Sequence, residues 1–171
     1  KQAMNQGYEV IEFIEGNSVE PADEPLLKAK FKEFSARNNN MSVSDILNMI
    51  KTNVPLLSGL TTLQLREFMI DSDMRTPREN EVIFAKGDFT NTFYSIVSGN
   101  AYVEINPDDS RQRITLNSGT FFGEMSLISG RRRSATIVAG DNCILIETPR
   151  RSMNKTISSV ESVKRVIDEA F

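Results

Sequence analysis

The pattern of apolar and polar residues divides the chain into a helical beginning, a β-rich middle and a helical end. Across residues 80–148 the apolar runs are short, rich in Val, Ile, Phe, Tyr and Thr, and separated by turn-forming residues. This spacing is typical of an all-β barrel or jelly roll. The segments at 102–105 and 113–116 alternate, so one face of each should point inward, where a ligand would lie.

Helices are expected before the β-rich region. Apolar residues recur at helical spacing over 43–52, and a second helix is predicted over 62–73, ending before a proline. Residues 1–41 are expected to form a linker and helical N-terminal extension, followed by one domain over 42–171. The predicted N-caps are Ser42 or Ser44 for the first helix and Thr61, in a capping box with Gln64, for the second.

Helices are also expected after the β-rich region. Pro149 suggests the first position of a short helix over 149–157, with Thr148 as its cap. Ser158 and Glu161 have the spacing of a capping box that would start an amphipathic helix over 159–171. The predicted fold class is therefore mainly β with flanking helices: a jelly-roll barrel with N-terminal and C-terminal helices.

Composition excludes several classes of protein. The chain has 20 Lys and Arg against 23 Asp and Glu, a net charge of −3, which gives no field for attracting nucleic acid. With no histidine and one cysteine, Cys143, it lacks the material for a histidine-based triad, a zinc site or an internal disulfide. We therefore expect no enzyme, no catalytic residues, no metal site and no direct binding to nucleic acid.

Targeting signals are also missing from the pattern. No apolar stretch has the roughly 20 residues of a membrane helix, and no signal peptide opens the chain, so we expect a cytoplasmic protein without membrane insertion. The chain begins at Lys1 and stops within an amphipathic run. We expect it to be part of a longer protein, with a covalently attached effector domain outside this sequence.

Candidate chemistry is concentrated over residues 121–136. Gly123 has no Cβ, so backbone can approach a ligand closely, and the N–H groups of the following turn can point at an anion. Arg133 can offer two parallel donors to phosphate oxygens. Glu124 would repel a phosphate unless a group between them needs an acceptor, and a ribose hydroxyl is such a group. Since no P-loop or G-x-G-x-x-G pattern occurs, the segment favours a compact nucleotide such as a cyclic 3′,5′-nucleotide.

These residues also carry a family resemblance. Phe-Gly-Glu-Met-Ser-Leu-Ile-Ser-Gly at 122–130, followed by Arg-Ser-Ala-Thr at 133–136, resembles the phosphate-binding cassette of the cyclic nucleotide-binding domain family. The resemblance extends upstream through 54–60, 86–88 and 96–99 and covers the chain from near Ser42 to its end. It departs at Arg132, where many members have proline, and at Ser126, where a smaller residue is common.

The resemblance implies a role for each matching residue. Glu124 would accept a hydrogen bond from the ribose 2′-hydroxyl, and Arg133 would pair with the exocyclic phosphate oxygens. Apart from the resemblance, the alternation within 102–105 makes Val103 a candidate apolar wall beside the base, with ordinary core packing as the alternative. We interpret Arg131 and Arg132 as solvated neighbours of Arg133. The remaining residues of the implied site are Phe122, Gly123, Met125, Ser126, Ser134 and Ala135, with backbone of Gly123, Ser126 and Ala135 and the Ser134 hydroxyl completing the cradle.

By this resemblance the chain would bind cAMP, or cGMP, and transmit occupancy through its flanking helices to the rest of a larger protein. The apolar side chains at 125, 127 and 128 could repack against Val163 or Ile167, and the residue that caps the base would fall at or beyond Phe171. The final helix could instead pack on a partner helix, for example in a homodimer. The alternative function is a nucleotide-free docking or dimerisation module; a transcription-factor or ion-channel sensor stays open.

Overall fold

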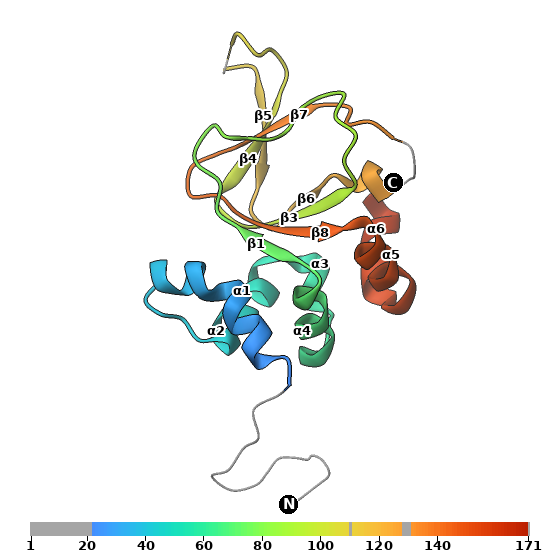
Figure 1. Ribbon diagram of the computed structural model, residues 1–171. Coiled ribbons are helices and arrows are strands. Elements are labelled where there is room, and N and C mark those ends of the chain that lie inside the picture. The colour runs from blue at the N-terminus through green and yellow to red at the C-terminus, as the bar shows by residue number, and fades with distance from the viewer. Residues whose placement is uncertain (1–21, 110, 128–130, 171) are drawn as a thin grey trace, which may run out of the picture.

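Two β-sheets stand above a layer of helices in the computed structural model, which describes residues 22–109, 111–127 and 131–170 (Figure 1). The helices are α1 (Glu24–Arg37), α2 (Val43–Asn53), α3 (Pro55–Ser58), α4 (Thr62–Ile70), α5 (Arg150–Ser159) and α6 (Glu161–Ala170), with a 3₁₀ turn, η1 (Glu124–Leu127). The strands are β1 (Asp73–Arg75), β2 (Val82–Phe84), β3 (Thr92–Ser98), β4 (Asn100–Glu104), β5 (Arg113–Asn117), β6 (Phe121–Phe122), β7 (Thr136–Ala139) and β8 (Ile144–Pro149).

The eight strands form two four-stranded antiparallel sheets. Their orders are β1-β8-β3-β6 and β2-β7-β4-β5, so most hydrogen-bonded neighbours are distant in sequence. This is the jelly-roll arrangement with helices at both ends that the short apolar runs predict. The two alternating segments pair with each other as β4 and β5, in the register Val103 to Ile114 and Ala101 to Leu116.

Side-chain caps define the starts of α2 and α4. The Ser42 hydroxyl accepts a hydrogen bond from the Asp45 N–H at 3.1 Å, which identifies Ser42 rather than Ser44 as the N-cap of α2. At α4 both bonds of the capping box are present, from Gln64 N–H to the Thr61 hydroxyl at 3.1 Å and from Thr61 N–H to the Gln64 side chain at 2.9 Å. The predicted caps at these two helices are confirmed.

Tertiary pairing changes other boundaries. The helix expected to reach residue 73 ends at Ile70, because β1 begins at Asp73 and pairs with β8. Pro149 is the N-cap of α5 rather than its first residue, and the Thr148 hydroxyl, predicted as the cap, instead lies 2.9 Å from the buried Ser72 hydroxyl. The two helix-start predictions at this boundary are therefore wrong by one residue.

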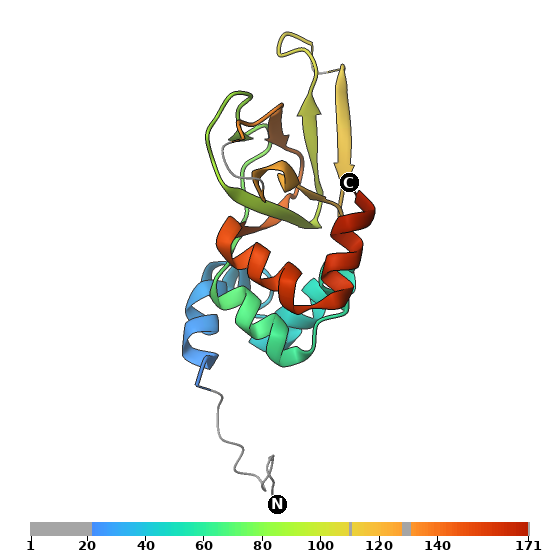
Figure 2. The same ribbon diagram turned by 90° about the vertical axis from the view of Figure 1, so that its right-hand side faces the viewer.

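The capping box predicted for the last helix is also wrong. Ser158 lies inside α5, where its hydroxyl donates to the Lys155 carbonyl at 3.0 Å. The chain leaves α5 at Val160, whose extended backbone (φ −125°, ψ 108°) separates the two helices, and α6 begins at Glu161. Burial of Met153 in α5 and of Val163 and Ile167 in α6 sets where these helices lie. α5 packs against β8 and β3, whereas α6 contacts α5 and α3 (Figure 2).

The core has two parts. One lies among the helices and reaches the first sheet, and α1 contributes Leu27, Phe31 and Phe34 to it. The other lies between the sheets. A mostly buried ion pair fixes α1 further, because Arg66 of α4 bonds Asp23 at 3.0 Å and also contacts Glu24. The helical part of the N-terminal extension therefore packs in the same core as α2 to α4.

Candidate functional site

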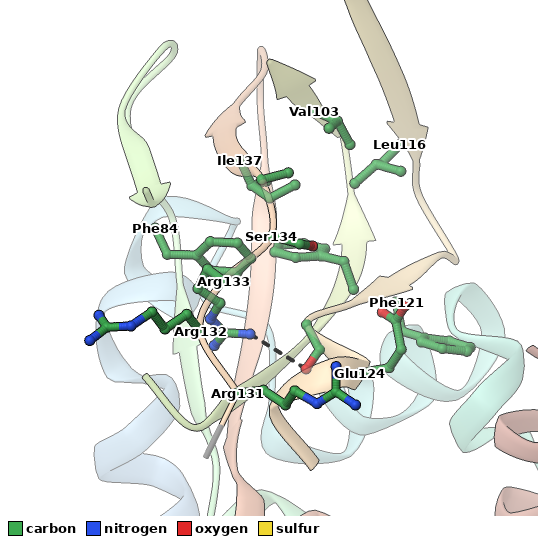
Figure 3. A pocket seen from close by; sticks show the side chains of 13 residues that line it. Phe84, Val103, Leu116, Phe121, Glu124, Arg131, Arg132, Arg133, Ser134 and Ile137 are labelled. Atoms are coloured by element: carbon green, nitrogen blue, oxygen red, sulfur yellow. Dashed lines mark hydrogen bonds between the residues drawn. The ribbon is translucent and has the colours of Figure 1, made fainter. Parts of the chain in front are cut away.

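A cavity of about 260 Å³ opens between the two sheets beside η1. Its two ends differ in chemistry: Arg131, Arg133 and Glu124 gather at one end, and Val103, Leu116 and Ile137 at the other (Figure 3). The complete lining is Phe84, Val103, Leu116, Phe121, Phe122, Gly123, Glu124, Arg131, Arg132, Arg133, Ser134, Ala135 and Ile137. Such a cavity suits a small ligand with one anionic and one apolar end, and its volume is just below the roughly 300 to 1,000 Å³ common for ligand pockets.

Arg133 is the most constrained side chain of the cavity. It is 6% exposed, and its Nε donates to the Thr90 hydroxyl at 2.6 Å while Nη2 donates to the Thr92 carbonyl at 2.6 Å. Its Nη1 makes a long bond of 3.5 Å to the Gly123 carbonyl, and the guanidinium lies 4.0 Å from the centre of the Phe84 ring. The side chain is thus held on one edge and on one face.

The charge of Arg133 is poorly compensated. Burial lowers the pKa of its guanidinium from the ordinary value, whereas Tyr94, Asp88 and Glu124 favour the charged form at longer range. Within the described residues it forms no ion pair, and its hydrogen-bond partners are all neutral. Because an arginine stays protonated even so, an anion entering the cavity would gain a charge-assisted contact there.

Gly123 makes room for this arginine. Its φ of +82° is in the region that favours glycine, and an added Cβ would lie 3.0 Å from both Arg133 Nη1 and the Thr92 carbonyl oxygen. The sequence suggested that the missing Cβ lets backbone approach a ligand. In the structure the space is used first by the guanidinium, so the glycine and the arginine depend on each other.

Glu124 is the first residue of η1 and lines the same cavity as Arg133. The two residues are close enough for the carboxylate to favour the arginine's charge, yet no ion pair joins them within the described part of the chain. The structure therefore brings the Glu124 carboxylate and the Arg133 guanidinium to one cavity and leaves both charged groups available to a ligand.

The apolar end is built by sheet register. Val103 pairs with Ile114 on one side and with Ile137 on the other, which places Ile137 on the same face of the sheet. Leu116 follows Ile114 by two residues and so shares this face. Sequence reasoning named Val103 and missed Leu116, Ile137 and Phe84; the alternation within 113–116 signalled Leu116, but Ile137 and Phe84 required the pairing.

The other predicted residues are placed as follows. Phe122, Ser134 and Ala135 line the cavity, with Ser134 exposed. Met125 and Ser126 lie in η1. Leu127, the last residue of η1, packs on the core that contains Val163 and Ile167. Ile128 and Phe171 lie outside the described residues.

Arg131 and Arg132 are both exposed at the cavity. Arg132 donates to the Gly87 carbonyl at 3.0 Å and lies over the Phe89 ring, which connects it to the loop before β3. Among the described residues, no group of three or more His, Cys, Asp or Glu side chains could hold a metal ion. A search of the same residues finds no helix long and apolar enough to span a membrane.

Comparison with known proteins assigns the family. A family model described as "Cyclic nucleotide-binding domain" matches residues 74–159, which is half of the chain. The chain belongs to this family. As a cyclic nucleotide-binding domain it is of a regulatory rather than a catalytic type, and the match runs from the second residue of β1 to the end of α5.

Curated relatives place the cyclic nucleotide-binding domain in much larger proteins. A Rhodopseudomonas palustris protein named as a candidate potassium channel is 31% identical over 116 residues, covering 68% of this chain and 28% of the relative. The cGMP-dependent protein kinase of Plasmodium berghei is 28% identical over 146 residues, covering 84% of this chain and 16% of the kinase. The chain thus spans less than a third of these relatives.

Solved structures share the fold at low identity. The sensor domain of the transcriptional regulator DNR from Pseudomonas aeruginosa has a TM-score of 0.60 at 16% identity, covering 73% of this chain and 85% of that one. The regulatory domain of Toxoplasma gondii PKA, solved with cAMP, has a TM-score of 0.57 at 18% identity, covering 78% and 54%. The regulatory subunit of a protein kinase A described as cAMP-independent, from Trypanosoma brucei, has a TM-score of 0.59 at 19% identity, covering 73% of this chain and 44% of that one. The fold alone therefore does not decide the ligand.

Proposed function

We propose that this domain binds a cyclic mononucleotide and transmits its occupancy to a larger protein through the helices that flank the sheets. The observation that carries the proposal is the buried guanidinium of Arg133, whose hydrogen-bond partners among the described residues are all neutral and which faces a cavity with an apolar far end. A buried cation without a carboxylate partner favours an anionic ligand, because the ligand then completes a charge pair already desolvated on one side.

The ligand's phosphate belongs at Arg133 and its ribose at Glu124. A free phosphate beside Glu124 would be repelled, whereas a ribose hydroxyl placed between the two charges donates to the carboxylate. In a cyclic 3′,5′-nucleotide the phosphate forms a ring with the ribose, so both groups fit together in the charged end of the cavity. The base then extends toward Val103, Leu116 and Ile137, whose apolar side chains give it a nonspecific wall.

The cavity and the relatives distinguish less clearly between cAMP and cGMP than between a cyclic nucleotide and other ligands. Relatives named for cGMP and a structure named for cAMP both resemble this chain. Ser134 is exposed at the cavity and can donate to a phosphate or to a guanine, so it favours neither strongly. We propose cAMP as the ligand, with cGMP as its direct competitor.

Transmission would begin at η1. This turn carries Glu124 at its first residue and Leu127 at its last, and it contacts α5 and β3. Because Leu127 packs on the core shared with Val163 and Ile167 of α6, a shift of η1 toward a bound ribose changes what the C-terminal helices pack against. A ligand moves such an equilibrium only by binding one arrangement more tightly than the other.

A nucleotide-free docking or dimerisation module is the second function to test. The Trypanosoma brucei subunit, from a kinase named as cAMP-independent, shares the fold, so the fold by itself does not require cAMP. The cavity argues against it here, because burying Arg133 without an ion pair would bring such a module no benefit.

Isothermal titration calorimetry with cAMP tests the proposal at Arg133. Removing one partner of a buried charge pair costs about 2 to 5 kcal/mol, so Arg133→Ala should bind roughly thirtyfold to a few thousandfold more weakly. Arg151→Ala, which removes the same charge from an exposed position on α5, serves as the control and should bind like the parent. Equal affinity of the Arg133 variant and the parent would contradict the assigned phosphate partner.

A further inference from the structure

The bonds of Arg133 divide its guanidinium into a held edge and an open edge. An arginine has five N–H groups arranged as a planar fork. Nε and Nη2 form one edge, and each is fixed at 2.6 Å by an acceptor on the segment before and at the start of β3: the Thr90 hydroxyl and the Thr92 carbonyl. Within the described residues, the Nη1 and Nη2 edge has only the long contact to the Gly123 carbonyl, which leaves this edge for a bidentate anion.

Thr90 is the only side chain in the described part of the chain that accepts a hydrogen bond from this guanidinium. The other two acceptors are main-chain carbonyls of Thr92 and Gly123, whose positions the fold sets. The Phe84 ring restrains the face of the guanidinium but not its rotation within the plane. In-plane orientation therefore depends on the edge contacts, of which the one at Thr90 can be removed by substitution.

We infer that Thr90 is a positioning residue, which orients Arg133 so that its Nη1 and Nη2 edge faces the cavity before any ligand arrives. A guanidinium held in this way loses little rotamer freedom on binding, which raises affinity without a new contact. The neutral hydroxyl orients the guanidinium and leaves its positive charge in place. A carboxylate at the same position would neutralise that charge. The inference rests on the proposed function only for its consequence for affinity.

The loop around Thr90 supports this role. Arg133 N–H donates to the Asp88 carbonyl at 2.8 Å, and Gly87 N–H donates to the Arg133 carbonyl at 2.7 Å. Main chain and side chain of Arg133 are therefore both held by residues 87–92. Thr90 itself is exposed, so its substitution changes no core packing.

The experiment compares Thr90→Val with Thr90→Ser, using Thr115→Val as the control for the same substitution at an exposed strand position. Calorimetry with cAMP should show about five- to tenfold weaker binding for Thr90→Val, because one bond to a charged group is lost at an exposed site. Thr90→Ser keeps the hydroxyl and should bind within about twofold of the parent. In the Arg133→Ala background Thr90→Val should cost nothing more, since the residue acts only through the arginine.

Nuclear magnetic resonance of the unliganded protein separates this inference from the proposed function. The Nε–H signal of Arg133, identified by its loss in Arg133→Ala, should exchange slowly with water in the parent and in Thr90→Ser, and about tenfold faster in Thr90→Val. If this holds but the parent binds no cyclic nucleotide, the proposed function fails and the positioning role stands. Unchanged exchange in Thr90→Val, or an equal affinity loss with and without Arg133, overturns the inference.

Discussion

At the residue scale, Gly123 has two separate functions that a substitution can distinguish. Alanine there must adopt a φ of +82° and also place a Cβ 3.0 Å from Arg133 Nη1. We expect Gly123→Ala to lose about 1 to 3 kcal/mol of stability, a fall in Tm of roughly 2 to 12 °C, and to weaken cAMP binding by displacing the arginine.

Gly119 provides the matched control for this substitution. Its φ is +90°, and an added Cβ would lie 3.1 Å from the Asn53 carbonyl oxygen rather than near Arg133. Gly119→Ala should therefore show a similar fall in Tm with little change in affinity. If both variants bound cAMP as the parent does, Gly123 would serve backbone geometry alone.

Cys143 is a second residue with a measurable consequence. The sequence indicated a small buried hydrophobe, and the structure places it in the core just before β8, where burial raises the pKa of its thiol from 9.0 to about 11. Because the folded state holds this proton more tightly, the contribution is intact below pH 9 and is lost as the pH rises toward 11.

Urea unfolding at several pH values tests this shift. The unfolding free energy of the parent should fall by about 2 to 3 kcal/mol more than that of Cys143→Ala between pH 9 and 11. The alanine variant controls for every other group that titrates in this window. Parallel curves for the two proteins would mean that the thiol is not perturbed.

At the element scale, the ion pair between α1 and α4 is the contact that most directly fixes the N-terminal helix. Arg66 is 10% exposed, and its substitution would leave Asp23 and Glu24 facing each other at 23% and 18% exposure. Because the two carboxylates are partly exposed, breaking this pair should cost less than breaking a fully buried one. We expect Arg66→Met to lower the free energy of unfolding by about 1 to 3 kcal/mol.

Arg37→Met is the control for Arg66→Met, because Arg37 forms an exposed ion pair with Glu33 of the same helix. Such pairs contribute at most about 0.5 kcal/mol. Urea midpoints of the two variants should therefore differ clearly. Equal midpoints would indicate that the Arg66 ion pair adds no stability beyond the other contacts of α1.

Elements whose signals are local could be predicted from the sequence, and those that depend on distant pairing could not. Ser42 and Thr61 cap their helices through residues three positions away, so their patterns sufficed. The end of α4 depends on β8, more than 70 residues later, and Thr148 is engaged by Ser72 across the fold. No window of sequence around either site contains that information.

The site divides in the same way. Gly123, Glu124 and Arg133 lie on one short segment, and their residue types alone indicated a phosphate and a ribose. The apolar end is assembled from β2, β4, β5 and β7, so Phe84 and Ile137 became visible only through the sheet register. Thr90 carried no sequence signal, because its role depends on where the arginine points.

At the scale of the whole molecule, the sheets and helices of the described chain share one connected arrangement. Residues of both sheets line the cavity, and η1, whose Glu124 also lines it, packs through Leu127 on the core that includes α5 and α6. Its relatives carry the domain within longer proteins, among them a kinase and a candidate channel. Domains of this family therefore occur in relatives named for different activities.

The most direct test of the account is a thermal-shift titration of the unmodified chain with cAMP, cGMP, 2′-deoxy-cAMP and AMP. At a hundredfold excess over its dissociation constant, a ligand adds about 2.7 kcal/mol of stability, which corresponds to a rise in Tm of roughly 5 to 11 °C. The account predicts this rise with a cyclic nucleotide, a smaller one with the 2′-deoxy analogue at equal concentration, and little with AMP. No rise with cAMP or cGMP at millimolar concentration, or an equal rise with AMP, would contradict it.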